Sequence, residues 1–354
     1  MDALKDICLE QARRYRKMQP QDAVKLVFQN EFGGGHLISN ANVSMEYLNE
    51  EAAGLDPSNA QPLFEDIGNN ICRVNLEPFI AKGYSLSTIN RLFVVSSNLI
   101  KGSTDSLNDK LSLLCSIADE CQFNFSAHDL YEYLDSYKKD NYPIPRHSDI
   151  YRKAYKPAYR VISKKYIKYL NVFDMIEQRL HEKESVVMAI DGRCGSGKTN
   201  LAALISEVYN CNVIHMDDFF LPPLLRTEDR LNEAGGNVHY ERFRDEVIEG
   251  LLKGDRFEYR VFDCAKMDYQ KVTKTVSPKA LTIIEGTYSL HPLFASIYDL
   301  KVFTSCSYEQ QQRRILNRDG AQMLTRFIEE WIPMEENYFS AYSIPESCDL
   351  VISG

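Results

Sequence analysis

The chain has 354 residues, of which 44% are hydrophobic and 26% are charged, and its formal net charge is −9. This length predicts two domains, and the composition is that of an ordinary globular protein. The acidic balance argues against a general nucleic-acid or membrane-surface binder, and no apolar run approaches the ~20 residues that a membrane-spanning helix needs. The charged residues 1–18 hold no signal-peptide core, so we expect a cytoplasmic protein.

Nine cysteines are scattered along the chain without a CxxC pair. Zinc sites and disulfide frameworks have regular cysteine spacings, and this set has none. We therefore expect reduced thiols, most of them in the core.

Residues 1–168 show no clear strand pattern and predict a mainly α-helical domain, to which the sequence gives no role. Ser44 and Ser87 are typical of helix starts, because their hydroxyls accept hydrogen bonds from the first backbone N–H groups. The expected helices span residues 4–17, 20–30, 44–53, 78–82, 87–99, 106–121, 127–138 and 150–170. Residues 169–184 predict a connecting helix before the second domain.

Two stretches of the first half are unusual. The run Gly33-Gly34-Gly35-His36 is either an anion-binding nest or a plain loop between helices. Residues 145–160, which include the run from Arg146 to Arg160, carry five cationic side chains and three tyrosines, and Pro157 would break any helix through them. This stretch either contacts phosphates in a substrate cleft or packs its tyrosines under a domain interface.

From Val186, an apolar strand, a glycine-rich turn and an amphipathic helix follow in direct succession. The turn fits the pattern GxxxxGKT. Its glycines let successive N–H groups face one point, and the N-terminus of the helix adds a partial positive charge. We predict that this loop holds a triphosphate, that its lysine reaches the terminal phosphates and that its threonine is a ligand of Mg²⁺. The residues of the loop are Gly192, Arg193, Cys194, Gly195, Ser196, Gly197, Lys198 and Thr199.

After this helix, strand and helix patterns alternate to the end of the chain. Such alternation predicts a parallel sheet with helices on both faces and ligands at the carboxyl ends of its strands. The candidate strands are residues 212–216, 257–262, 280–284, 300–304 and 350–352, and the helices between them include residues 240–252, 308–317 and 325–342.

Acidic residues follow two of these strands. Transfer of a phosphoryl group to a hydroxyl needs a base, and Asp217 is our candidate. Its neighbour Asp218 either faces the site as well or caps the turn, because spacing alone does not separate the two. Glu285 follows the strand at 280–284 and is the second acidic group, so Asp217 and Glu285 are the candidate carboxylates for Mg²⁺.

Two arginines in the helix at 308–317 and its end are the candidate cations of the site. Arg314 and Arg318 are spaced i, i+4 and therefore share one face. They either close over a transferring phosphate or form a solvated helix surface.

In order along the chain, the segments GRCGSGKT, MDDFFLPP, GGNVHYERF, YRVFDC, IIEGTYSLHP, RRILNRDG and WIPMEENYF resemble the uridine kinase and phosphoribulokinase group of P-loop kinases. The resemblance covers residues 185–354 and does not extend to the first half. It implies a five-stranded parallel core, ATP and Mg²⁺ as cosubstrates, Asp217 as the catalytic base, and a closing lid that carries Arg314 and Arg318.

The sequence departs from that family where the acceptor binds. His239 stands where uridine kinases have an acidic residue for the ribose hydroxyls, and Met267 stands where they have a histidine for the pyrimidine. A carboxylate accepts two hydroxyl protons, whereas a neutral imidazole accepts one hydrogen bond. The residues that we expect to shape the acceptor pocket are Asp218, His239, Tyr240, Arg242 and Asp263.

The function predicted from the sequence is ATP-dependent phosphoryl transfer to a hydroxyl of a small molecule, such as a nucleoside. One alternative is a nucleotide-dependent regulator whose helical half binds a partner. Another is a kinase for a phosphopentose-, pantothenate- or glycerate-like acceptor, for which the stretch from Arg146 to Arg160 supplies extra positive charge. We expect no nucleic-acid or membrane partner, and the sequence leaves open whether the chain forms a homo-oligomer.

Overall fold

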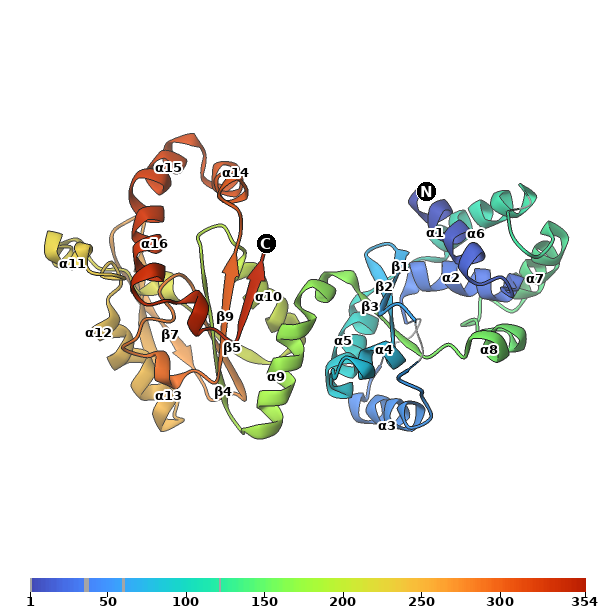
Figure 1. The fold of residues 1–354 in the computed structure, drawn as a ribbon, viewed down its shortest axis with the longest axis horizontal. Coiled ribbons are helices and arrows are strands. Elements are labelled where there is room, and N and C mark those ends of the chain that lie inside the picture. Colours follow the sequence, from blue (N-terminus) through green and yellow to red (C-terminus); the bar gives the residue numbers. More distant parts are fainter. Residues whose placement is uncertain (1, 35–37, 59–60, 121) are drawn as a thin grey trace. The chain divides into compact units, whose positions relative to one another are not determined.

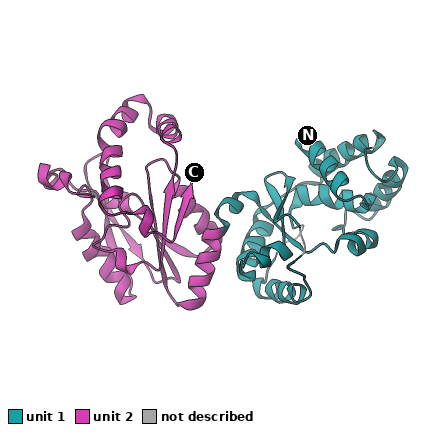
Figure 2. Ribbon diagram, viewed as in Figure 1, with its two compact units in different colours: residues 1–170 teal, residues 171–354 magenta. Residues whose placement is uncertain are grey.

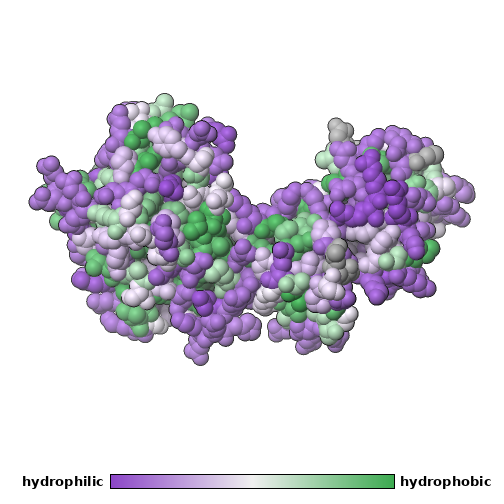
Figure 3. Space-filling model, in the orientation of Figure 1, coloured by the Kyte–Doolittle hydropathy of each residue, from purple (hydrophilic) through white to green (hydrophobic). Residues whose placement is uncertain are grey.

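The computed structural model describes residues 2–34, 38–58, 61–120 and 122–354. Contacts divide the chain into two compact units, residues 1–170 and 171–354 (Figure 2). On the face drawn in Figure 3, hydrophilic residues cover most of the surface of each unit. Gly35 and His36 of the predicted nest lie outside the described residues.

The first unit is mainly helical, as predicted, but it also contains a small antiparallel sheet in the order β1-β2-β3 (Figure 1). Its core forms where α2, α6 and α7 pack together with β1, around side chains such as Val24, Leu111 and Leu134. The elements are α1 (Asp2–Arg14), α2 (Pro20–Phe32), α3 (Ala41–Ala52), β1 (Phe64–Gly68), β2 (Ile71–Asn75), α4 (Leu76–Ala81), α5 (Leu86–Leu99), α6 (Thr104–Asp119), α7 (Ala127–Lys139), α8 (Asp149–Tyr155), β3 (Tyr159–Ser163) and η1 (Lys164–Tyr169).

The predicted helix over residues 150–170 is wrong. Only α8 forms in its first third, and it ends at Lys156, which has a left-handed φ of 43° directly before Pro157. The chain then continues as β3, which pairs with β2 through residues such as Val161 opposite Arg73. Proline stops the helix, and the five-residue strand that follows has no exposed residue, so it shows no alternation of buried and exposed side chains.

The second unit is built on a five-stranded parallel sheet in the order β10-β9-β4-β8-β5, which confirms the predicted sheet. Figure 1 shows α9 and α10 on one side of the sheet and α12, α13 and α16 on the other. The strands are β4 (Val186–Gly192), β5 (Cys211–His215), β8 (Leu281–Glu285), β9 (Leu300–Ser305) and β10 (Leu350–Ser353). The helical elements of this unit include α9 (Leu170–Glu182), α10 (Lys198–Val208), α12 (Tyr240–Phe243), η4 (Arg244–Ile248), α13 (Glu249–Lys253), α14 (Tyr308–Asp319), α15 (Ala321–Arg326), η6 (Phe327–Trp331) and α16 (Ile332–Ala341).

The strand predicted over residues 257–262 is present but is not part of the parallel sheet. It is β6 (Phe257–Asp263), which forms an antiparallel hairpin with β7 (Asp268–Val276). Short helical segments lie between β5 and α12, namely η2 (Met216–Phe219), η3 (Pro223–Leu225) and α11 (Glu228–Asn232), and two more, η5 (Ala295–Ile297) and η7 (Pro345–Ser347), flank the last strands.

The connecting helix predicted over residues 169–184 is present as α9, and it packs within the second unit. Arg179 Nε donates to Asp299 O over 3.1 Å, and Lys183 pairs with the Asp299 carboxylate. Each of the eight cysteines that the structure describes is a free thiol. A search of the described helices finds none with the length and apolar character that crossing a bilayer requires.

Candidate active site

The glycine-rich loop leaves β4 through a position that only glycine can occupy. Gly192 has a φ of +143°, and a Cβ atom there would lie 2.0 Å from the backbone oxygen of Thr304. Gly195 and Gly197 also have positive φ values, of +71° and +103°. Ser196 Oγ forms a 2.6 Å hydrogen bond with Thr304 Oγ1, so β9 fixes the loop from the other side. The three glycines thus give the loop a tightly turned backbone, the kind of turn that can present its N–H groups to an anion.

Lys198 begins α10, and its ammonium group lies across the loop. Nζ donates to the backbone oxygens of Gly192 over 2.7 Å and Arg193 over 3.0 Å, and to Thr287 Oγ1 over 3.1 Å. The N-cap of α10 is Gly197, which has no side chain to accept from the first N–H groups of the helix. An uncapped helix N-terminus beside a lysine is a suitable site for phosphate.

Parallel register brings a carboxylate next to this helix start. Ile190 of β4 and His215 of β5 both lie opposite Glu285 of β8. The Glu285 carboxylate, only 4% exposed, accepts hydrogen bonds from Thr199 Oγ1 over 3.2 Å and from His215 Nδ1 over 2.5 Å. The hydrogen bond to Glu285 and the negative charge of its carboxylate raise the pKa of His215. Sequence analysis missed His215, although its place at the end of β5 was a usable signal.

The two neighbouring aspartates after β5 have different surroundings. Asp218 is buried, and its carboxylate accepts from Lys274 Nζ over 2.7 Å and from Tyr259 OH over 3.2 Å. Asp217 is exposed. Protein atoms nevertheless crowd its carboxylate, and this desolvation raises its pKa, while the positive charge of Lys198 opposes the rise. The positive charge of Lys198 thus acts on Asp217, whereas Asp218 joins β6 and β7 through Tyr259 and Lys274.

Most of the residues predicted for the acceptor pocket have structural partners. The buried guanidinium of Arg242 donates to Arg260 O and Glu246 and lies 4.3 Å over the Phe219 ring. His239 Nδ1 caps α12 by accepting from Arg242 N over 3.3 Å.

Tyr240 and Asp263, which were also predicted for the acceptor pocket, have partners within the protein as well. The Tyr240 ring stacks on His291 at 5.0 Å and its hydroxyl donates to Glu233. Asp263 accepts from the backbone N–H groups of Ala265 and Lys266 and so shapes the turn between β6 and β7. At that turn, Cys264 Sγ lies 4.0 Å from Asp217 O, so the hairpin end borders the site.

Two buried carboxylates that the sequence did not indicate support the loop. Asp191, fully buried at the end of β4, accepts from Gly192 N over 2.7 Å and from Tyr338 OH over 2.8 Å. Glu335 of α16 accepts from Cys194 N over 3.0 Å and from Thr287 Oγ1 over 3.2 Å. Burial raises the pKa of both carboxyls.

The helix α14 contacts the loop through one of the two predicted arginines, Arg314, while Arg318 is exposed. Arg314 Nη1 donates to Gly195 O over 3.0 Å, and Arg318 pairs with Asp319 at 2.8 Å. The loop residue Arg193 forms a bidentate pair with Glu336, at 2.6 and 3.0 Å. The loop is therefore joined to both ends of the segment that runs from α14 to α16.

The sequence matches no protein-family model and no curated protein. Three solved structures with detectable similarity are a possible uridine kinase from Bacillus stearothermophilus, a proposed fructose transport system kinase from Silicibacter sp. TM1040 and D-glycerate 3-kinase from Cryptococcus neoformans. Their identities are 19%, 20% and 15%, and their TM-scores are 0.39, 0.40 and 0.33. The matches cover 51%, 50% and 46% of this chain, and 99%, 96% and 85% of those chains.

Proposed function

We propose that the second unit is a kinase that transfers the terminal phosphoryl group of ATP to a hydroxyl of a small molecule. One observation carries the proposal: the loop lysine Lys198, the Thr199–Glu285 pair and the exposed Asp217 gather at the carboxyl ends of three adjacent parallel strands. Ligands of parallel α/β sheets bind at this edge.

The nucleotide would bind with its phosphates on the loop of residues 192–199. The first N–H groups of α10 would donate to them, and the ammonium of Lys198 would exchange its carbonyl acceptors for phosphate oxygens. This exchange needs only a rotation of the lysine side chain, because the loop backbone already has the required bend.

The oxygen atoms of Thr199 and Glu285 fit Mg²⁺, which prefers oxygen ligands and keeps several waters. Within the described parts of the chain, no cluster of three or more His, Cys, Asp or Glu side chains could hold a metal ion. These two residues would thus complete a site formed mainly by phosphates and water. Bound there, the ion would offset the charge of the terminal phosphates.

Asp217 would act as the general base. As the acceptor oxygen bonds to the γ-phosphorus, the hydroxyl proton passes to the Asp217 carboxylate and the bond from phosphorus to the bridging oxygen breaks, which releases ADP. The raised pKa of Asp217 makes this carboxylate a stronger base than an ordinary aspartate. Arg314 and Arg318, on the helix beside the loop, would stabilise the charge on the transferred group.

The acceptor would bind between Asp217 and the end of the hairpin of β6 and β7. The side chains of Asp218, Arg242 and Asp263 already form hydrogen bonds with other groups of the protein. They are therefore poor candidates for contacts with the acceptor. We propose a nucleoside or another sugar-like alcohol, with a glycerate-like acceptor as the alternative to test.

Release of ADP should be measured with the full chain against nucleosides, sugars, sugar phosphates and glycerate. We expect one class to accelerate ADP release, Asp217→Asn to abolish the acceleration without loss of ATP binding, and Asp245→Asn, at an exposed surface aspartate, to change nothing. Full activity of Asp217→Asn would exclude the base assignment. Slow hydrolysis that no acceptor accelerates would instead favour a regulatory nucleotidase.

A further inference from the structure

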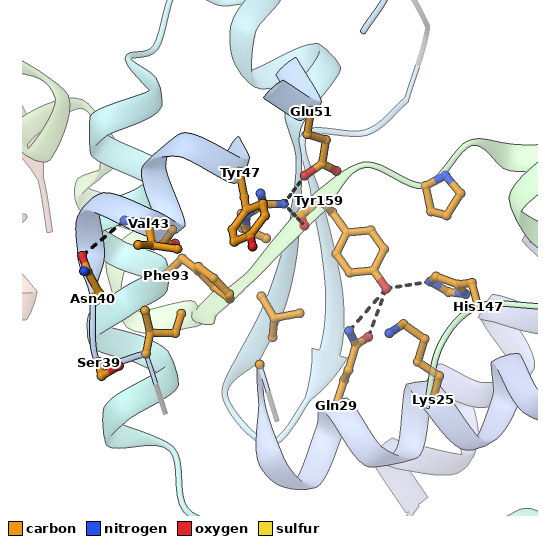
Figure 4. Close-up of a pocket in the computed structure, with 16 residues that line it drawn as sticks. Lys25, Gln29, Ser39, Asn40, Val43, Tyr47, Glu51, Phe93, His147 and Tyr159 are labelled. Carbon is orange, nitrogen blue, oxygen red and sulfur yellow. Dashed lines mark hydrogen bonds and ion pairs between the residues drawn. The ribbon is translucent and has the colours of Figure 1, made fainter. Parts of the chain in front are cut away.

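The first unit contains a pocket that the proposed kinase chemistry does not use. Its volume is ≈ 680 Å³, within the range of small-molecule sites. It lies among α2, α3, α5 and β3, and Figure 4 shows side chains from these elements around it. Its lining includes Lys25, Gln29, Tyr47, Phe93, His147 and Tyr159.

A chain of hydrogen bonds fixes the polar end of the pocket (Figure 4). His147 Nε2 lies 2.7 Å from Tyr159 OH, and that hydroxyl also contacts the Gln29 amide, with Nε2 at 3.3 Å. On its far side, His147 Nδ1 lies 2.9 Å from Asp22 Oδ1. Burial lowers the pKa of His147 to about 4, so its imidazole is neutral at neutral pH. These groups are held in place before any ligand arrives.

Two cationic side chains, Lys25 and Arg73, lie near this polar end, and the buried Glu65 carboxylate, 3.9 Å from Arg73, balances the charge of the arginine. Within the described residues, the only hydrogen-bond acceptor of Lys25 Nζ is a carbonyl, Pro145 O at 2.9 Å. The buried guanidinium of Arg73 lies 4.8 Å from the Tyr159 ring and donates to Gln29 Oε1. Burial of Lys25 and its proximity to Arg73 lower the pKa of Lys25 to about 8. The ammonium is thus a partly buried cation with a second cation nearby.

Lys25 forms no ion pair with a carboxylate among the described residues, and the negative charge of Asp22 acts on it only through space. Both oxygens of Asp22 are already engaged: Oδ1 accepts from Ser148 N over 2.9 Å, and Oδ2 accepts from Ser148 Oγ over 2.7 Å and from Gln19 N over 3.0 Å. Two of the three protons of the Lys25 ammonium therefore have no acceptor among the described residues, and an anion in the pocket would supply one.

The side of the pocket opposite Lys25 is apolar. Val43, Tyr47 and Phe93 form an apolar and aromatic surface there, and Tyr47 is 67% exposed. Beside it, Arg160 pairs with Glu51 at 2.7 Å, so the charge of this arginine is already balanced. The pocket thus combines one cationic end with one apolar side.

We propose that this pocket binds a small organic anion, with its carboxylate or phosphate group beside Lys25 and its apolar or ring portion against Val43, Tyr47 and Phe93. His147 and Tyr159, from the basic, tyrosine-rich stretch, are already hydrogen-bonded to each other, to Asp22 and to Gln29, so they would form a fixed polar wall beside the anionic group. The proposal concerns a site of the first unit alone and does not depend on the function proposed for the second.

Calorimetric titration of the full chain with phenyl phosphate, benzoate and neutral benzyl alcohol tests it. We expect saturable binding of at least one anion, much weaker binding of the alcohol, and a loss of about tenfold or more in Lys25→Met, which keeps the apolar stem of the side chain. Arg152→Gln, at an exposed arginine of α8, should bind as the native chain does.

Two further variants keep the result decisive. Lys198→Ala should retain the binding, because the phosphate loop is not the site; loss of binding in this variant would overturn the proposal. If Lys25→Met does not fold, the exposed Tyr47→Ala tests the apolar wall and should also weaken binding. No saturable binding, equal binding of benzyl alcohol, or unchanged affinity in Lys25→Met or in Tyr47→Ala would refute the proposal.

Discussion

Asp217 and Asp218 are adjacent in sequence, yet Asp217 is exposed and Asp218 is buried. They lie in η2, a single 3₁₀ turn, in which successive side chains point about 120° apart. Lys274 and Tyr259 hold Asp218 in the interior, whereas Asp217 is exposed and feels the charge of Lys198. Sequence analysis left this choice open because it depends on where β7 and β6 pack, which no local pattern states.

The raised pKa of Asp217 leads to a prediction about pH. A general base must be deprotonated, so the rate of transfer should fall on acidification at a pH above that at which an ordinary aspartate titrates, roughly 3.9. A profile of kcat/KM against pH, measured at saturating nucleotide, reports this limb. A rate that stays constant until ordinary aspartates titrate would contradict the role of Asp217.

A second prediction concerns His215 and Glu285. Because the Glu285 carboxylate raises the pKa of His215, Glu285→Gln should lower that pKa toward its ordinary value and should also weaken the dependence of activity on Mg²⁺. Titration of the histidine signals by NMR measures the change, and the His239 signal serves as the internal reference. If the His215 titration were unaltered, the 2.5 Å contact would be absent in solution.

At the scale of elements, the strand, loop and helix from β4 to α10 were predictable because their pattern is local. The sheet of the first unit was not. Its β2 is buried throughout, so it lacks alternation, and it joins β1 by a tight turn through Asn69 and Asn70, both with positive φ. The hairpin of β6 and β7 was missed for a related reason, since a strand pattern does not reveal its partner.

The close approach of Gly192 to the backbone of Thr304 gives a prediction for stability. Gly192→Ala should lower the free energy of unfolding of the second unit by about 3 kcal/mol or more, since the new methyl group meets the backbone of Thr304 at a positive φ. Gly254→Ala is the matched control, with a φ of +69° and open space around it, and should cost only ~1 kcal/mol. Trp331, the single tryptophan, lies in this unit and reports its urea midpoint by fluorescence. Equal midpoints for the two variants would show that the loop relaxes.

The helix α14 gives a prediction for catalysis. Arg318→Gln should reduce kcat about 10–100-fold with little change in the KM for ATP, because a guanidinium that acts on developing charge matters most in the transition state. Arg313→Gln, at an exposed arginine of the same helix, controls for loss of charge alone. A similar decrease in both variants would indicate a general effect of charge and not a role for Arg318.

At the scale of the whole molecule, we propose two separate sites, one in each unit. The second unit was the more predictable, because its phosphate loop is a contiguous motif and the residues around it follow from the parallel sheet. The pocket of the first unit draws Lys25, Phe93 and Tyr159 from three distant segments, and only folding brings them together. The basic stretch at 145–160 was noticed in the sequence, but its partner Asp22 was not.

The most direct test of the central claim is a crystal structure of the full chain with Mg²⁺ and a non-hydrolysable ATP analogue. We expect the phosphates to lie on the backbone N–H groups of residues 195–199, Lys198 Nζ to have left Gly192 O for the terminal phosphate, and the Asp217 carboxylate to face that phosphate. A nucleotide bound elsewhere, or an Asp217 side chain turned away from the terminal phosphate, would contradict the account.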